Sequence, residues 1–195
     1  MSRDRRIVLA SGSPYRRQLL ERLGLAFEVH PPEIDESARA GESPDALVSR
    51  LSCAKAEALA DAHCDALIIG SDQVAELAGQ ALGKPGTHEA ALDQLARLSG
   101  RRVRFLTGLC LLDARSGDRD SCSVTTEVAF RQLAPAEIER YVTREGPYDC
   151  AGSFRSEALG ISLFRAVHSE DPTALMGLPL IRLAEMLRAR GVEVP

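Results

Sequence analysis

The sequence predicts an α/β fold: a mixed, twisted β-sheet with helices on its faces. Two observations lead to this prediction. Short apolar runs alternate with helix-forming segments at the start of the chain, and two long β-rich runs follow between residues 102 and 131. The chain has 195 residues, 45% of them hydrophobic and 27% charged. This length and composition are typical of one globular domain, so we expect a single domain over residues 1–195.

The first strand and helix are predicted from the N-terminal region. Ile7–Ala10 is a continuous apolar run, typical of a short buried strand, and a turn rich in serine and glycine follows it. Ser13 can cap the next helix and Pro14 suits its first position. Gly24 is the predicted stop, and the apolar face of this helix is formed by Leu19, Leu20 and Leu23.

The same order of elements repeats further along. Ser43 and Pro44 predict the start of a second helix that extends to about Ala62, with Val48, Leu51 and Leu59 on one face. Ala66–Gly70 is a second predicted buried strand, and the polar residues Ser71, Asp72 and Gln73 follow it. We therefore expect Asp72 just beyond the carboxyl end of a strand, where open α/β sheets bind ligands.

The second half of the chain predicts a hairpin and two helices. The runs Arg102–Asp113 and Cys122–Arg131 flank the turn-like segment 116–118, so we expect a long antiparallel hairpin inserted in the α/β scheme. One helix is predicted over Pro135–Thr143. Another lies near the C-terminus and ends at Gly191; its apolar positions, at helical spacing, are Leu180, Leu183, Ala184 and Leu187.

Charge and cysteine content limit the classes of function. Lysine and arginine total 24 against 28 acidic residues, a net charge of −4. This argues against a protein that coats nucleic acid, which needs a broad basic field. The five cysteines are far apart without a C-x-x-C pair, which favours a reducing cytoplasm over zinc or disulfide chemistry. No run of about 18 apolar residues occurs, so we expect no membrane partner and a cytoplasmic protein.

The turn over residues 11–17 could bind phosphate. It combines Ser11, a helix N-terminus, Arg16 and Arg17. Backbone N–H groups and the positive end of the helix dipole favour an anion there, and arginine adds charge-assisted hydrogen bonds. An ordinary capped helix with solvated arginines is the alternative.

Carboxylates occur at two places where a metal or a general base could act. Asp72 could coordinate Mg²⁺ or deprotonate water, or simply cap the following turn. The proline-stiffened loop 31–37 holds Glu33, Asp35 and Glu36, a set of oxygen donors that suits a hard divalent cation but is also common on protein surfaces.

Two lysines and a small-residue segment complete the candidates. Lys55 lies on the apolar stripe of its helix, so its charge must snorkel, pair or act in a site. Lys84 lies in a loop flanked by glycine and proline that could present it to an anion or could be a surface turn. The segment 149–161 allows close backbone approach, and its Glu157 could accept hydrogen bonds from a base. The four histidines are isolated and are expected to be structural or surface residues; they are His30, His63, His88 and His168.

In order and spacing, these segments resemble the Maf family of nucleoside triphosphate pyrophosphatases over about residues 7–187. The motifs that carry the resemblance are Leu9-Ala10-Ser11-Gly12-Ser13-Pro14 with Arg16, Ile34-Asp35-Glu36, Ala54-Lys55-Ala56, Ser71-Asp72, Leu82-Gly83-Lys84-Pro85 and Ala151-Gly152-Ser153.

The resemblance implies a Maf/ITPase-like α/β fold, with two lobes around a central cleft, and a possible homodimer. It implies hydrolysis between the α- and β-phosphates of a nucleoside triphosphate with Mg²⁺ or Mn²⁺. Asp72 would activate the water and share the metal with Glu36. The phosphates would be held by Ser11, Arg16, Lys55 and Lys84.

Three positions resemble the branch of the family that acts on 7-methyl-GTP and yields 7-methyl-GMP and pyrophosphate, removing a modified nucleotide from the pool. They are Tyr15, Gln73 and Glu157, although that branch more usually has Trp at the position of Tyr15. A methylated guanine is cationic and suits an aromatic face and a carboxylate. Two alternatives remain open: a dTTP/UTP pyrophosphatase, and a regulatory protein that inhibits septum formation by binding.

Overall fold

The computed structural model describes residues 5–195. Within them one mixed sheet of seven strands runs in the order β2-β1-β3-β5-β6-β7, with β4 paired to β3. The strands are β1 (Ile7–Ala10), β2 (Glu28–Val29), β3 (Leu67–Leu77), β4 (Gln80–Leu82), β5 (Arg102–Asp113), β6 (Arg119–Phe130) and β7 (Phe164–Ser169). The α-helices are α1 (Pro14–Glu21), α2 (Pro44–Glu57), α3 (His88–Leu98), α4 (Pro135–Glu145) and α5 (Leu180–Ala189).

The predicted N-terminal elements are confirmed. β1 has the predicted bounds, and the Ser13 side chain accepts a hydrogen bond from the Arg16 backbone N–H at the start of α1. Ser43 caps α2 in the same way, with Pro44 in the first turn. However, α2 ends at Glu57 and gives way to turns before Ala62, so the predicted helix is too long at its C-terminal end.

The predicted hairpin is also confirmed, but it forms the middle of the sheet. β5 pairs with β3 on one side and β6 on the other, and β6 begins at Arg119, three residues earlier than expected. α3 and the strands β2, β4 and β7 are elements that the sequence analysis does not predict. The strands among them are short or lie at the edge of the sheet, so they lack the long apolar pattern of a central strand.

The position expected for Asp72 is wrong in one respect. Asp72 lies inside β3, opposite Gly108 of β5, and the strand continues to Leu77. The polar residues do not end β3 because β5 supplies hydrogen-bonding partners along almost its whole length. On its other edge β3 pairs with β1 only as far as Ala10 opposite Gly70, so Asp72 comes just after the parallel neighbour has ended.

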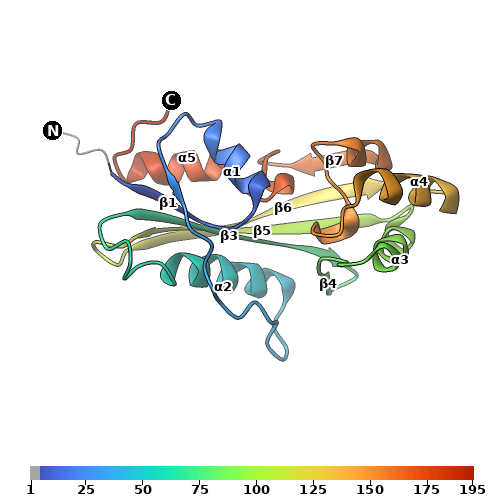
Figure 1. Cartoon of the computed structure of the whole chain (residues 1–195), viewed down its shortest axis with the longest axis horizontal. Coiled ribbons are helices and arrows are strands. Elements are labelled where there is room, and N and C mark those ends of the chain that lie inside the picture. Colours follow the sequence, from blue (N-terminus) through green and yellow to red (C-terminus); the bar gives the residue numbers. More distant parts are fainter. Residues whose placement is uncertain (1–4) are drawn as a thin grey trace.

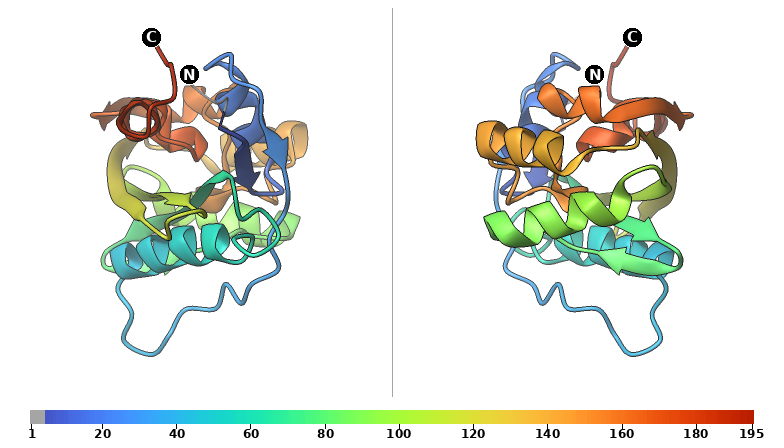
Figure 2. Two further views of the ribbon diagram at one scale, coloured as in Figure 1. Left: turned by 90° about the vertical axis from the view of Figure 1, so that its left-hand side faces the viewer. Right: turned by 90° about the vertical axis from the view of Figure 1, so that its right-hand side faces the viewer.

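Helices cover both faces of the sheet, with α1 and α5 on one face and α2 on the other (Figure 1). The alternation of side chains along the strands explains this layering. Leu9 and Ile69 pack in the cluster that includes α1 and α5, whereas Val8 and Ile68 pack in the cluster that includes Ala56 of α2. A separate core joins α3 and α4 to the far half of the hairpin, at the other end of the sheet (Figure 2).

Two strand glycines let α2 lie very close to the sheet. A Cβ atom on Gly70 would lie 2.1 Å from the Ser52 carbonyl oxygen, and one on Gly108 would lie 2.3 Å from the Val48 carbonyl oxygen. Only glycine leaves room for this approach. The contact brings the next turn of α2, which carries Lys55, over the middle of β3. Within residues 5–195, no helix combines the length and apolarity needed to cross a membrane.

Candidate functional site

A pocket of about 480 Å³ opens where β1 ends and β3 continues. It is bordered by the turn into α1, the loop between β2 and α2, the middle of β3, and the segments around Lys84, residues 149–157 and Gly177. Nine candidate residues line this one pocket: Ser11, Tyr15, Arg16, Glu36, Lys55, Asp72, Gln73, Lys84 and Glu157. Three other candidates, Arg17, Glu33 and Asp35, are exposed and do not line it.

The centre of the pocket holds one lysine between two carboxylates. Lys55 Nζ lies 2.6 Å from Asp72 Oδ1 and 2.9 Å from Glu36 Oε1. The Lys55 and Asp72 side chains are buried, whereas Glu36 is 55% exposed at the pocket mouth. Snorkelling is therefore excluded for Lys55, because its ammonium group is paired inside the protein. A buried lysine of this kind needs paired charges, since isolated burial of an ion is very costly.

The local field favours the ionised form of Glu36. Burial opposes ionisation, but the hydrogen bond and charge of Lys55, together with the charges of Lys84 and Arg16, keep the pKa of Glu36 below its ordinary value. The pocket thus combines anionic oxygens with cations from three different elements. Glu36 and Asp72 are hard oxygen donors that approach a common cation, so their chemistry fits a divalent ion such as Mg²⁺ or Mn²⁺.

Ser11 and Arg16 form the end of the pocket at the α1 N-terminus. Ser11 Oγ accepts hydrogen bonds from the Ser13 N–H and from Arg16 Nη1, at 3.2 and 3.3 Å. Arg16 Nε donates to the Gly177 carbonyl oxygen at 2.8 Å, which fixes the guanidinium against the loop before α5. Burial lowers the pKa of Arg16, opposed by the charges of Asp72 and Glu36. This end presents an oriented cation and a helix N-terminus, which together suit an anionic ligand.

The pocket also has an aromatic and an acidic side chain in its lining, Tyr15 and Glu157. Tyr15 is half-buried in the first turn of α1, and the Arg155 guanidinium carbon lies 5.8 Å from the centre of its ring. Burial, with the charges of Cys150 and Asp149, raises the pKa of Tyr15 to about 12. Glu157 is exposed at the pocket edge, where its carboxylate accepts a hydrogen bond from Ser156 Oγ. An aromatic face and a carboxylate that line the same pocket suit a cationic or hydrogen-bonding ring.

Gln73 holds a loop against the sheet, a role that its position in the sequence does not indicate. Its Nε2 donates to Thr107 Oγ1 at 3.0 Å and to the carbonyl oxygens of Ala174 and Leu175 at 2.8 and 3.1 Å. These bonds attach the loop before α5 to β3. The amide N–H₂ group is therefore engaged by the protein, and the loop it holds carries Gly177, the partner of Arg16.

Arg155 lies next to the pocket-lining residues Phe154 and Ser156, and the sequence gives no reason to single it out. Besides its contact with the Tyr15 ring, it donates to Asp149 Oδ1 at 3.2 Å and to the Glu145 carbonyl oxygen at 2.9 Å. Although burial opposes its charge, the hydrogen bonds with Cys150 and Asp149 raise its pKa. Arg155 and Tyr15 are 140 positions apart in the chain, so no local sequence pattern predicts their contact.

Together, the fold and the pocket define an α/β protein with a cleft that offers paired carboxylates and convergent cations to a polyphosphate ligand. The family model described as "Maf-like protein" matches residues 6–190, and the chain belongs to this Maf family.

Curated relatives match over nearly their whole length. A protein of Cupriavidus pinatubonensis, named "7-methyl-GTP pyrophosphatase", is 55% identical over 186 residues, covering 95% of this chain and 94% of its own. A protein of Pseudomonas aeruginosa with the same name is 57% identical over 189 residues, covering 97% and 98%. Among solved structures, the Staphylococcus aureus Ham1 protein matches with a TM-score of 0.54 at 14% identity, covering 95% of this chain and 100% of its own. This last likeness concerns the fold alone, and it agrees with the predicted Maf/ITPase-like class.

Proposed function

We propose that this protein is a nucleoside triphosphate pyrophosphatase that converts 7-methyl-GTP to 7-methyl-GMP and pyrophosphate. The observation that carries the proposal is the placement of Lys55 Nζ within 2.9 Å of both Asp72 and Glu36, in a pocket that is also lined by Arg16 and by the aromatic side chain of Tyr15. The names of the curated relatives support the same substrate. Two lobes of a single domain would enclose the nucleotide.

The triphosphate would lie between the α1 N-terminus and the loop of Lys84. Arg16 is held in place by Gly177 and Ser11, so little side-chain entropy is lost when it binds a phosphate oxygen. Lys84 is exposed at the rim and would reach the outer phosphates. Lys55 would balance the charge that develops on the reacting phosphate. Phosphoryl transfer depends mainly on such positioning and charge stabilisation.

Asp72 would act as the general base. Its Oδ1 accepts the hydrogen bond from Lys55, and no hydrogen bond found within residues 5–195 uses its Oδ2. Oδ2 would take a proton from water as the water oxygen bonds to the α-phosphorus. The bond from that phosphorus to the oxygen bridging it to the β-phosphate would break, and pyrophosphate would leave with the bonding electron pair. Glu36 and Asp72 would hold a divalent cation, which when bound neutralises phosphate charge and lowers the pKa of nearby water.

The methylated base would be selected by Tyr15, Gln73 and Glu157. N7-methylation gives guanine a positive charge, which the face of Tyr15 and the carboxylate of Glu157 would both stabilise. Glu157 could also accept hydrogen bonds from the guanine N1–H and its amino group. Gln73 would contribute to selectivity by holding the loop of residues 174–177. We place this reaction in the cytoplasm; all five cysteines, which lie within the described residues, are free.

A nucleotide panel tests the proposal. The protein is incubated with Mg²⁺ or Mn²⁺ and 7-methyl-GTP, GTP, dTTP or UTP, and pyrophosphate release is measured. We expect 7-methyl-GTP to be the fastest substrate. Faster release from dTTP or UTP would contradict the assignment and favour the other branch of the family.

The role of Asp72 is tested by Asp72→Asn, which keeps the shape of the side chain and an oxygen for Lys55. We expect turnover to fall by at least about 100-fold, because general bases typically contribute 10²–10⁴-fold. Circular dichroism and the binding of a non-hydrolysable nucleotide should show a folded protein. Near-normal turnover would remove Asp72 from this role.

A further inference from the structure

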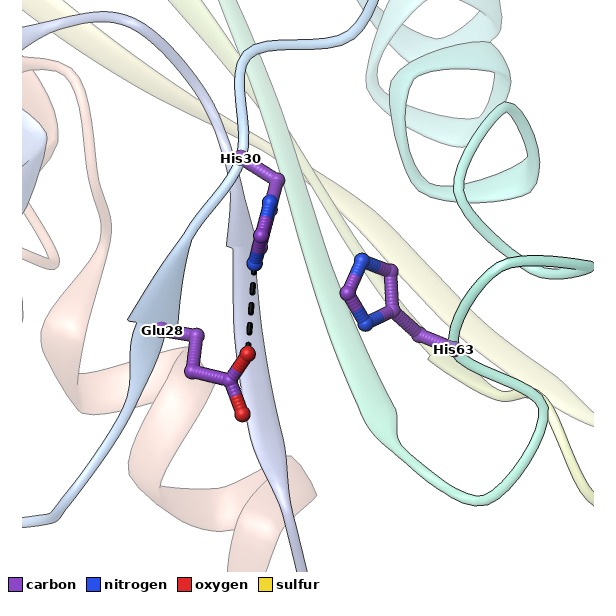
Figure 3. A group of neighbouring side chains, drawn as sticks. All are labelled: Glu28, His30 and His63. Atoms are coloured by element: carbon purple, nitrogen blue, oxygen red, sulfur yellow. Dashed lines mark hydrogen bonds and ion pairs between the residues drawn. The ribbon is translucent and has the colours of Figure 1, made fainter.

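A second cluster of potential ligands lies outside the pocket. Glu28 is on β2, His30 follows this strand, and His63 lies in the turns between α2 and β3. One ligand atom from each side chain lies within 4.8 Å of the others. Figure 3 shows the two imidazoles and the carboxylate directed toward one another across the space between β2 and the His63 turn. The sequence expectation that these histidines are isolated is therefore wrong, because the fold brings their ring centres to 4.4 Å.

His63 is the most informative member of the cluster. Its side chain is buried, with the residue only 9% exposed, and its Nδ1 atom has no hydrogen-bond partner among residues 5–195. Native proteins rarely leave a buried ring nitrogen unsatisfied, so such an atom calls for an explanation. A metal ion that accepts the nitrogen lone pair would provide one.

The carboxylate of the cluster is already oriented. Arg6 donates to Glu28 Oε1 from Nη2 at 2.9 Å and from Nε at 3.2 Å, while the other oxygen, Oε2, lies 3.2 Å from His30 Nε2. Arg6 is in turn paired with Asp65, close to the His63 turn. Hydrogen bonds to the outer oxygen are the usual means by which a protein fixes a metal-binding carboxylate. Oε2 and the two imidazoles therefore make a three-ligand set.

We propose that Glu28, His30 and His63 form a binding site for a divalent transition metal of the Zn²⁺ type, separate from the catalytic pocket. Two imidazoles and one carboxylate favour Zn²⁺ and its neighbours, whereas the oxygen-only donors of the pocket favour Mg²⁺ or Mn²⁺. Water would complete the coordination. Glu28 is exposed and His30 is half-exposed. Both side chains can therefore move closer to His63, so that all three ligand atoms reach one ion.

The position of the site gives the metal a structural effect on the pocket. His30 directly precedes Pro31 and Pro32, which line the pocket, and His63 follows the helix that carries Lys55. A Cβ atom on Gly12 would lie 3.6 Å from Pro31, so this wall lies close to the turn proposed to bind phosphate. A bound ion would join the start of the loop 30–43 to the turns that follow α2. It would hold one wall of the pocket without contacting the substrate.

Zn²⁺ binding to the chelator-treated protein of 195 residues tests this site. We expect one high-affinity Zn²⁺ per chain by competition with a chromogenic chelator. Co²⁺ should give the intense visible absorption of a tetrahedral site. His63→Gln and His30→Gln should each weaken Zn²⁺ binding by at least about tenfold, the loss seen even when groups that only support ligands are removed.

Two controls separate this site from other histidines and from the pocket. His168→Gln removes an exposed histidine on β7, and Glu36→Gln removes a pocket carboxylate; both should keep the wild-type Zn²⁺ affinity. If His63→Gln fails to fold, His30→Gln and the surface variant Glu28→Gln carry the test. Equal Zn²⁺ affinity in these variants and the wild type, loss of the site in Glu36→Gln, or no binding at micromolar Zn²⁺ would each overturn the proposal. A failed nucleotide panel would leave these measurements unaffected.

Discussion

Lys55→Met examines the charge balance at the centre of the pocket. Methionine keeps most of the volume of the lysine stem but removes the ammonium group that lies 2.6 Å from Asp72 and 2.9 Å from Glu36. The attraction between two unit charges 2.6 Å apart is about 6 kcal/mol at an effective dielectric of about 20. The desolvation of the lysine, several kcal/mol, opposes it.

The expected change in stability depends on the carboxylates that remain after Lys55 is replaced. Removing one partner of a buried ion pair costs about 3–5 kcal/mol, because the remaining charge is buried without compensation. Glu36 is more than half exposed, so water screens its share, and we expect the lower end of this range. Lys55→Met should therefore lower the free energy of unfolding by about 3 kcal/mol at pH 8.

The deficit should shrink as the pH falls. In the wild type the pKa of Glu36 is lowered, so its stabilising contribution is present above the ordinary glutamate pKa and is lost only at lower pH. In the variant Glu36 loses both the hydrogen bond and the charge of Lys55, so its folded-state pKa rises. Once this pKa exceeds its unfolded-state value, proton uptake by the folded variant restores stability as the pH falls from 8 toward 5, by at most about 1.4 kcal/mol for each pKa unit of the difference.

Urea denaturation at pH 8 and pH 5 measures both quantities. Lys84→Met is the matched control, because Lys84 is exposed and its loss should change stability by no more than about 0.5 kcal/mol. A Lys55→Met deficit below about 1 kcal/mol, or one that does not shrink at pH 5, would refute the reasoning about the buried charges.

Three further substitutions, one of them with a matched control, test base recognition and the packing of the fold. Glu157→Gln removes a charge beside the proposed base site and should reduce the ratio of kcat/KM for 7-methyl-GTP over GTP about tenfold; an unchanged ratio would exclude Glu157 from base recognition. Tyr15→Trp supplies a stronger cation–π surface and should lower KM for 7-methyl-GTP relative to GTP, whereas a higher relative KM would contradict stacking at this position. Gly70→Ala should destabilise the protein by about 3 kcal/mol in urea denaturation, because its Cβ would lie 2.1 Å from a backbone oxygen of α2. Gly83→Ala is the control: a Cβ atom at Gly83 would meet no atom within 4 Å, so this change should leave the stability unaltered. Equal losses of stability in the two alanine variants would disprove the close-approach argument.

Local sequence patterns predicted much of the fold. Capping residues and apolar spacing are properties of neighbouring positions, so Ser13, Pro14 and Ser43 indicated where α1 and α2 begin. The hairpin was predictable because two long β-rich runs enclose a turn. The set of pocket residues was proposed from short motifs and from the family resemblance that their order suggests, and all of these residues line one pocket.

Tertiary contacts decided the rest, because they depend on residues far apart in the chain. β3 continues through Asp72 because β5 pairs with it. Gly70 and Gly108 are needed for the close approach of α2, which the sequence alone does not indicate. The contact of Arg155 with the Tyr15 ring and the closeness of His30 to His63 likewise depend on the tertiary structure. Residue types and local order thus determined which elements form and which groups are present. Packing determined which of those groups meet, since distance in space is set by the whole fold.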